Sequence, residues 1–152
     1  MPSAPHLLLV EAPYYQHLAA LLRRGAERAL MAAGATFDTV SVPGAFEIPA
    51  AVATAARAGA RYDGYVALGC VIRGETTHYD HICNETARAI QDLGSRDGLA
   101  VGFGILTCED EAQALVRASP AVDHGGRDQG GRAVRACLAL VELKRRFTEG
   151  GR

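Results

Sequence analysis

The chain has 152 residues, a length that suits one domain with its own hydrophobic core. Hydrophobic residues make up 49% of it and charged residues 22%, which is the profile of an ordinary globular protein. The net charge of −1, with no basic run longer than Lys144–Arg146 and no apolar run near the ~20 residues of a membrane span, argues against nucleic-acid binding and against a transmembrane protein.

The first residues and the cysteines bear on where the protein resides. The start, MPSAPHLLLVEA, has no basic segment and only a short apolar run, so we expect no signal peptide. The cysteines at 70, 83, 108 and 137 are widely separated and form no CxxC pair. We therefore expect free thiols and a cytoplasmic protein.

Short apolar or β-branched runs predict four strands. They lie at His6–Glu11, Thr36–Val42, Tyr62–Ile72 and Leu99–Leu106. Each run is bounded by residues that favour turns, and segments with helical spacing follow each of them.

Apolar residues at helical spacing predict a helix over 15–33, which Gly34 ends. Further helices are expected over 49–58, 76–94 and 131–147. One more helix follows Thr107, which we expect to be its N-cap because Glu109, Asp110 and Glu111 then fall in its first turn. Residues 119–131 are rich in glycine and predict a loop.

The alternation of strands and helices predicts the fold class. Parallel strands joined by right-handed helical crossovers give a four-stranded parallel sheet inside a three-layer α/β/α sandwich of the flavodoxin-like type. We expect one domain over residues 1–152, with residues 1–5 and 148–152 flexible. Ligands of such sheets bind beyond the carboxyl ends of the strands, so the residues that follow the strands are candidates for a site.

Aromatic, acidic and imidazole side chains follow the predicted strands. Tyr14 comes after the first strand, PGAFE (43–47) after the second and RGETTH (73–78) after the third, while Phe103 lies in the fourth. Aromatic rings stack on flat heterocycles, and a carboxylate such as Glu47 accepts hydrogen bonds from hydroxyl or ring N–H groups.

The stretch GETTHYDHICNE (74–85) has residues suited to an anion site and residues suited to a metal site. Gly74–Thr77 opens a helix, whose free N–H groups and positive dipole end favour phosphate. His78 lies one turn further on and could transfer protons near neutral pH. His81 can share its face but Cys83 cannot, so only two ligands converge and we expect no metal site.

Each of these features also has a plain structural explanation. Many helices begin with nothing bound, and a single histidine is usually structural or solvated. Phe46 could belong to the core, Tyr14 could be a surface aromatic and Arg117 could be an ordinary helix residue. Their common placement on one edge of the predicted sheet favours a shared function.

Four segments of the chain are distinctive: VPGAFEIP (42–49), GCVIRGETTHYDHICNE (69–85), FGILT (103–107) and ALVRA (114–118). In this order they closely resemble the 6,7-dimethyl-8-ribityllumazine synthase family, and the resemblance runs along nearly the whole chain. It implies condensation of 5-amino-6-(D-ribitylamino)uracil with 3,4-dihydroxy-2-butanone 4-phosphate, the penultimate step of riboflavin biosynthesis. Phosphate and water are released, and no metal or organic cofactor takes part.

The resemblance also implies roles for residues that bind the pyrimidine. Tyr14 corresponds to the aromatic residue that stacks on the ring. The uracil and its ribityl chain are held by a segment in which Glu47 accepts from ribityl hydroxyls, namely Ala45, Phe46 and Glu47. The backbone of the third strand meets the pyrimidine at Cys70, Val71 and Ile72.

A second set of implied roles concerns the phosphate and the proton transfers. The phosphate-binding turn corresponds to Gly74, Glu75 and Thr76, and His78 corresponds to the proton donor. In the family, Phe103 and Arg117 enter the site from a neighbouring subunit. Arg117 would bind phosphate there through its permanently charged fork.

The chain departs from the family pattern at two positions. Pro13 stands where the family usually has arginine, and Gln129 stands where it usually has a lysine near the ribityl and phosphate region. Arg127 or Arg132 could replace the missing charge. The loop from Arg117 to Gly130 is longer than in members that build sixty-subunit shells, so we expect a homopentamer with active sites at subunit interfaces. Dimers of pentamers and the shell are the alternatives.

Other functions are compatible with parts of the pattern. A non-catalytic paralogue that binds lumazine or flavin, or serves in assembly, is supported only by the departures at Pro13 and Gln129. A phosphoacceptor receiver domain needs a cluster of carboxylates after the first strand, which Glu11 alone does not provide. A flavodoxin needs a Ser/Thr/Gly-rich phosphate loop there, and the sequence lacks one.

Overall fold

A parallel β-sheet forms the centre of the protein. The computed structural model describes residues 3–148, and in this range four strands lie side by side in the order β2-β1-β3-β4, all parallel. The strands are β1 (His6–Glu11), β2 (Thr36–Ser41), β3 (Gly64–Ile72) and β4 (Val101–Cys108). The predicted strands are therefore all present.

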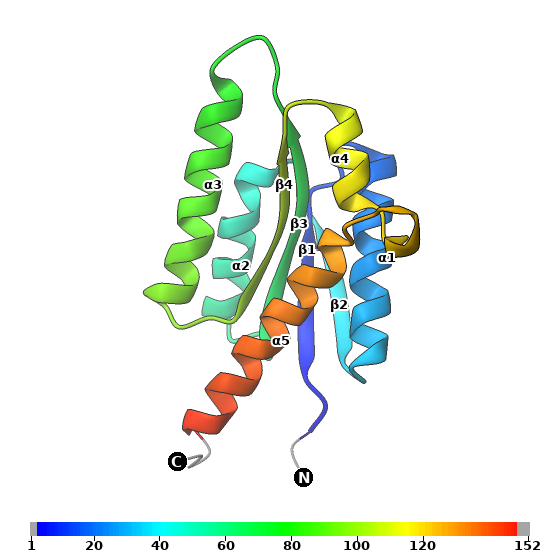
Figure 1. Cartoon of the computed structure of the whole chain (residues 1–152). Coiled ribbons are helices and arrows are strands. Elements are labelled where there is room, and N and C mark those ends of the chain that lie inside the picture. The colour runs from blue at the N-terminus through cyan, green and yellow to red at the C-terminus, as the bar shows by residue number, and fades with distance from the viewer. Residues whose placement is uncertain (1–2, 149–152) are drawn as a thin grey trace.

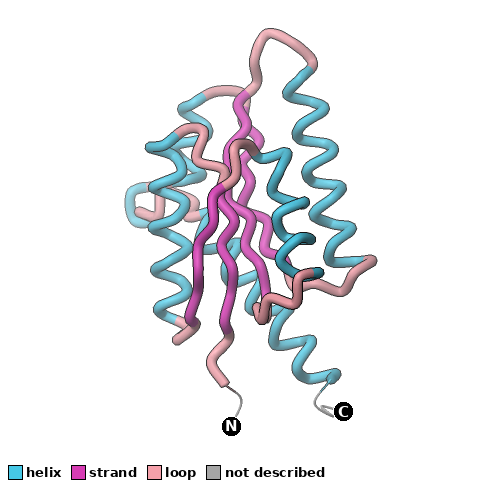
Figure 2. Tube along the Cα trace, turned by 180° about the vertical axis from the view of Figure 1, so that it is seen from behind, coloured by secondary structure: helices cyan, strands magenta, loops and turns pink. Residues whose placement is uncertain are grey.

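Helices cover both faces of the sheet. The described residues form α1 (Gln16–Ala32), α2 (Ile48–Arg57), α3 (His78–Ser95), α4 (Glu111–Ala118) and α5 (Gln129–Thr148), with short 3₁₀ turns η1 (Ala45–Glu47) and η2 (Val122–His124). Helices α1, α4 and α5 pack on one face, and α2 and α3 pack on the other (Figure 1). Figure 2 shows the sheet between these layers from behind. The predicted three-layer flavodoxin-like sandwich is confirmed.

Alternate residues of the central strands point into two separate cores. In β1, Leu7 and Leu9 face the core under α1, α4 and α5, whereas Leu8 and Val10 face the core under α2 and α3. All four side chains are buried. A strand covered on both faces needs apolar residues at every position, which explains why β1 reads as a continuous apolar run.

Glycine permits the close approach of α5 to its neighbours. A Cβ atom on Gly102 in β4 would lie 2.0 Å from the carbonyl oxygen of Ala133, and one on Gly130 would lie 2.1 Å from the carbonyl oxygen of Leu22 in α1. Neither distance is compatible with a side chain, so α5 packs directly on the backbone of β4 and α1.

Several predicted boundaries are wrong. Helix α3 begins at His78 and not at residue 76, so His78 is its first residue and does not lie one turn into it, and β4 spans Val101–Cys108 in place of Leu99–Leu106. Thr107 is not the N-cap of the helix after β4, because its backbone stays extended and pairs with Val71 in β3. The N-cap is Asp110, whose Oδ1 accepts a hydrogen bond from the backbone N–H of Gln113 at 2.8 Å. Tyr62 lies outside β3, and its hydroxyl donates to Asp38 at 2.8 Å instead.

The prediction of flexible ends concerns residues 1–5 and 148–152. Residues 1–2 and 149–152 lie outside the described residues, and Thr148 is the last residue of α5. None of the helices within residues 3–148 combines the length and the hydropathy that a membrane span requires.

Candidate functional site

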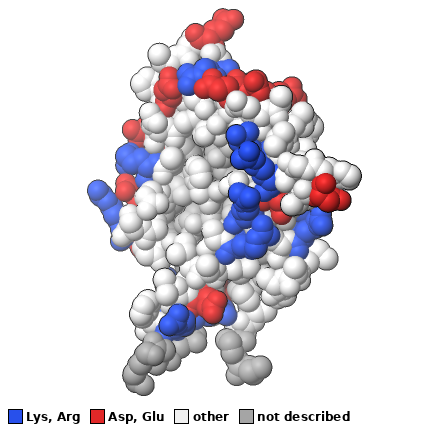
Figure 3. Space-filling model, in the orientation of Figure 1, with Lys and Arg blue, Asp and Glu red and all other residues white. Residues whose placement is uncertain are grey.

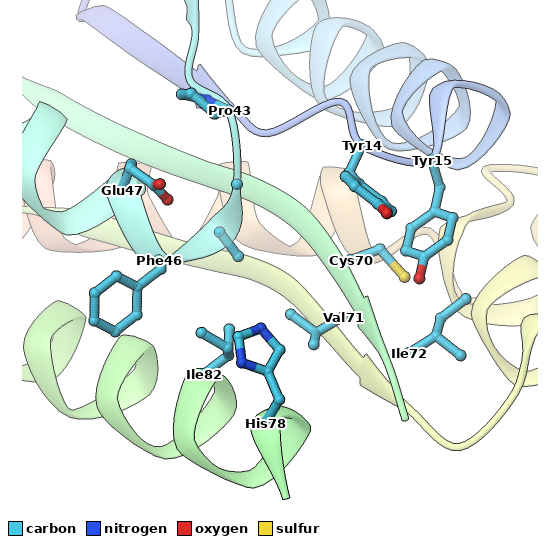
Figure 4. Close-up of a pocket in the computed structure, with 12 residues that line it drawn as sticks. Tyr14, Tyr15, Pro43, Phe46, Glu47, Cys70, Val71, Ile72, His78 and Ile82 are labelled. Carbon is cyan, nitrogen blue, oxygen red and sulfur yellow. The ribbon is translucent and has the colours of Figure 1, made fainter. Parts of the chain in front are cut away.

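The strand order creates a cleft at the carboxyl ends of β1 and β3. The chain passes from β1 to β2 on one side and then crosses to β3 on the other, so the connections diverge at this point. A cavity of about 530 Å³ lies there, a size typical of small-molecule sites. We call it the rim pocket (Figure 4); its lining is Tyr14, Tyr15, Pro43, Gly44, Ala45, Phe46, Glu47, Cys70, Val71, Ile72, His78 and Ile82.

Two aromatic rings of the rim pocket have open faces. Tyr14 is 74% exposed and Phe46 is 55% exposed. Figure 4 shows them on different sides of the pocket, with the end of β3 between them. Exposed rings at the wall of a cavity are suited to stacking against a flat heterocycle.

Glu47 and His78 supply a carboxylate and an imidazole to the rim pocket. Glu47 ends the η1 turn and is exposed, and His78 is the first residue of α3. The backbone N–H of His78 donates to Thr76 Oγ1 at 3.2 Å, which fixes the first turn of the helix. Figure 4 shows the imidazole beside Val71 at the end of β3, where it can exchange protons with a bound molecule.

Cys70 contributes a neutral thiol to the wall. Burial raises the pKa of this thiol to about 12, and the nearby Cys108 and Cys83 act in the same direction. Burial also raises the pKa of the Tyr15 hydroxyl. Because the thiolate is the nucleophilic form, this raised pKa disfavours a nucleophilic role for Cys70 at neutral pH.

The predicted phosphate-binding turn lies outside the lining of the rim pocket. Its residues form an exposed loop before α3: Gly74, Glu75 and Thr76. The loop is anchored by Arg73, whose Nε donates to Glu109 at 2.7 Å and whose Nη2 lies 3.4 Å from Asp80. Arg73 therefore joins the start of α3 to the segment that follows β4.

A second group of predicted site residues lies at the free edge of β4. Phe103, Arg117 and Gln129 line a separate pocket of about 190 Å³, which we call the arginine pocket, and it shares no lining residue with the rim pocket. Figure 3 shows basic side chains gathered where Figure 1 places the end of α4 and the start of α5. Within one chain these three residues do not reach the residues of the rim pocket.

The residues that suggested a metal site are dispersed. His81 is exposed, Cys83 is half-buried and Glu85 pairs with Arg88 at 2.7 Å. No group of three or more His, Cys, Asp or Glu side chains is placed to hold a metal ion anywhere in the described part of the chain.

The family profile described as 6,7-dimethyl-8-ribityllumazine synthase matches residues 4–145. The chain belongs to this family. It is 50% identical to the 6,7-dimethyl-8-ribityllumazine synthase of Agrobacterium fabrum, over 95% of this chain and 98% of that protein. It is 52% identical to 6,7-dimethyl-8-ribityllumazine synthase 1 of Rhizobium meliloti, over 93% of each chain. The protein of that name from Sphingopyxis alaskensis is also 52% identical, over 95% of this chain and 99% of the relative.

Membership of the lumazine synthase family confirms the resemblance read from the four segments. The rim pocket also contains two residues that the sequence analysis did not single out, Tyr15 and Ile82. Ile82 lies four residues after His78, and this spacing places it on the same helix face. That spacing was a usable signal, whereas Tyr15 looked like part of the helix start.

Proposed function

We propose that the protein is a transferase that condenses 5-amino-6-(D-ribitylamino)uracil with 3,4-dihydroxy-2-butanone 4-phosphate to give 6,7-dimethyl-8-ribityllumazine, phosphate and water, as the penultimate step of riboflavin biosynthesis. The observation that carries the proposal is the match to lumazine synthases along nearly the whole chain. It is supported by the rim pocket, which has aromatic, carboxylate and imidazole groups at the carboxyl ends of β1 and β3.

The rim pocket suits the pyrimidine substrate. In the proposal, Tyr14 stacks on the ring, and the segment Ala45–Glu47 lies along the ribityl chain. Glu47 accepts hydrogen bonds from ribityl hydroxyls. The backbone at Cys70–Ile72 meets the polar edge of the ring, because the last residues of β3 extend along the pocket wall.

The chemistry needs two substrates held together and protons moved between them. The 5-amino group adds to the ketone of the butanone phosphate and water leaves, which gives an imine. Elimination of phosphate, attack of the ribitylamino nitrogen and loss of a second water close the new ring. His78 donates and accepts the protons, and positioning of the two substrates supplies much of the rate.

The proposed active site is completed by a second copy of the chain. The candidate residues divide between two pockets that share no lining residue, and the second pocket lies at an edge strand. Phe103 in that strand is 38% exposed and borders an apolar groove that also contains Leu140, which is 42% exposed. We propose a homopentamer in which Phe103 and Arg117 approach the rim pocket of the neighbour, with Arg117 and the Gly74–Thr76 turn on the phosphate.

The proposed location is the cytoplasm, which is supported by four free thiols at positions 70, 83, 108 and 137, all within the described residues. The proposed reaction uses no metal or organic cofactor, as the resemblance to the family implies.

A steady-state assay with both substrates tests the function. Purified protein is expected to produce the fluorescent lumazine together with inorganic phosphate, and native mass spectrometry is expected to give five times the chain mass. Absence of product at high enzyme concentration refutes the enzyme.

A non-catalytic lumazine- or flavin-binding paralogue is the second candidate. It is favoured by Gln129 in the arginine pocket, where a neutral amide stands among arginines. Tight binding of flavin without any condensation would establish it in place of the enzyme.

A further inference from the structure

The arginine pocket brings three like charges together. Arg117 comes from α4, Arg127 from the loop before α5 and Arg132 from the first turn of α5, and all three line one cavity of about 190 Å³. Thr107 and Gln129 supply neutral polar groups, and no acidic residue is among the lining residues. Three guanidinium groups that share a small cavity repel one another unless an anion lies between them.

These arginines have no acidic partner within residues 3–148. Six other arginines pair with carboxylates at distances of 3.8 Å or less, namely Arg23, Arg73, Arg88, Arg96, Arg135 and Arg145. The side chain of Arg117 makes one hydrogen bond, from Nη1 to the carbonyl oxygen of Gln113 at 3.0 Å. Most of its five N–H donors remain available for a ligand.

The acidic residue closest in sequence is directed elsewhere. Asp128 lies between Arg127 and Gln129, but its Oδ1 accepts a hydrogen bond from the backbone N–H of Gly131 at 3.2 Å. Its Oδ2 lies 3.8 Å from Arg135. Asp128 therefore caps α5 and does not neutralise the pocket, and the positive end of the 20-residue helix adds to the field.

We propose that Arg127 and Arg132 join Arg117 in a three-arginine site for the phosphate dianion of the butanone substrate. The inference rests on the proposed function, because that function identifies the anion. Arginine remains charged at any working pH, and its planar fork can donate two hydrogen bonds to one phosphate. The third positive charge also offsets Glu75, which lies in the turn proposed to meet the same phosphate.

Charge-removing variants test the site in the assembled enzyme. Arg132→Gln and Arg127→Gln are each expected to raise both the KM for the butanone phosphate and the Ki of inorganic phosphate about tenfold. The KM for the ribitylaminouracil is expected to rise less than the KM for the butanone phosphate, because neither arginine lines the rim pocket. Arg146→Gln removes the same charge from an exposed position near the end of α5 and is expected to change neither constant.

The outcomes separate this inference from its rivals. Unchanged Ki values in both variants, with Arg117→Gln still raising the Ki, overturn the three-arginine site and leave the enzyme in place. A changed assembly mass with an unchanged Ki shows that the arginines bind another subunit, which also overturns it. Arg132→Lys is expected to recover part of the phosphate affinity, because it restores the charge without the fork.

The inference can also be tested if the protein makes no lumazine. Calorimetry then measures binding of inorganic phosphate to the wild type and to Arg132→Gln. Binding by the wild type that weakens about tenfold in the variant supports the anion site alone. No binding by the wild type overturns it.

Discussion

The guanidinium of Arg23 donates a hydrogen bond to the carboxylate of Glu11 across 2.9 Å, from α1 to the last residue of β1. Glu11 is only 5% exposed, so this pair places a satisfied charge beside the apolar core. The hydrogen bond and the charge of Glu11 raise the pKa of the Arg23 guanidinium. Glu11 therefore differs from the carboxylates of a phosphoacceptor site, which are exposed.

Removal of Arg23 leaves a buried carboxylate without its partner. Arg23→Ala is expected to lower the free energy of unfolding by about 2 kcal/mol, since a hydrogen bond to a charged group contributes about 1.5–3 kcal/mol and Arg23 is partly solvated. Urea unfolding measures the change. Arg24→Ala, at the exposed neighbouring position, is the control and is expected to stay within about 0.5 kcal/mol of the wild type. Equal effects of the two variants would contradict the prediction.

Replacement of His78 tests the proton carrier. His78→Ala is expected to lower kcat for lumazine formation by at least about tenfold, because positioned acid–base groups contribute that much or more. His81→Ala is the matched control, since it removes the same side chain from the next turn of α3 at an exposed position outside the rim pocket. The prediction fails if both variants retain wild-type turnover.

Removal of an aromatic ring tests how the pyrimidine is held. Tyr14→Ala is expected to raise the KM for the ribitylaminouracil about tenfold, because stacking on a base contributes about 1–3 kcal/mol. The melting temperature should stay within about 2 °C, since the ring is 74% exposed. Phe147→Ala, at an equally exposed ring in α5, should leave the KM unchanged. A stability loss without a KM change would assign Tyr14 a structural role.

The raised pKa values of two buried thiols predict how the free energy of unfolding depends on pH. Burial raises the pKa of Cys70 and of Cys137 from the ordinary value of 9.0 to about 12. Between these values the folded chain keeps protons that the unfolded chain releases, so the free energy of unfolding falls as the pH rises through this window, by about 1.4 kcal/mol per unit for each thiol. Urea unfolding from pH 8 to pH 11 in a reducing buffer measures the slope.

The variant Cys137→Ala separates one thiol from the rest. Above pH 9 the free energy of unfolding of this variant should fall less steeply than that of the wild type, by about 1.4 kcal/mol per pH unit. This difference in slope does not depend on the stability of the variant at pH 8. Equal slopes for the two proteins would exclude Cys137 as a source of the pH dependence.

The contact between α5 and β4 depends on Gly102. Gly102→Ala is expected to cost at least about 3 kcal/mol, because its Cβ would lie 2.0 Å from the carbonyl oxygen of Ala133 and the backbones would have to separate. Gly94→Ala in α3 is the control, since the nearest heavy atom to its Cβ lies at 3.6 Å. Alanine favours the helix there and should add stability of about 0.5 kcal/mol. A well-folded Gly102→Ala of wild-type stability would show that α5 can move.

The fold could be predicted from the sequence because its signals were local and consistent. Continuous apolar runs at Leu7–Val10 and in β3 indicated strands that are buried on both faces. The helical segments between the strands provide the helices that pack on those faces. The error at Thr107 arose because pairing with β3 extended the strand past a residue that could also have capped a helix. Strand pairing is not visible in a local pattern.

The candidate site could be predicted only in part. Topology alone placed Tyr14, Phe46 and His78 on one rim, and they line one pocket. The gathering of Arg127 and Arg132 beside Arg117 depends on the path of the loop before α5, for which the sequence offers only glycines and one proline. A loop of this kind acquires its shape from tertiary hydrogen bonds, such as that from the backbone N–H of Asp128 to the carbonyl oxygen of Ser119.

Asp128 fixes where α5 begins and therefore which side chains of α5 face the arginine pocket. Its backbone has a φ of 47°, its N–H is tied to Ser119, and its side chain holds the N–H of Gly131. Length changes before this residue can be absorbed by the loop. One residue inserted after it would turn the helix face by about 100°, because an α-helix has 3.6 residues per turn, and would carry Arg132 away from its pocket. An insertion before Asp128 is therefore expected to leave the arginine pocket intact, whereas an insertion directly after it is expected to dismantle the pocket.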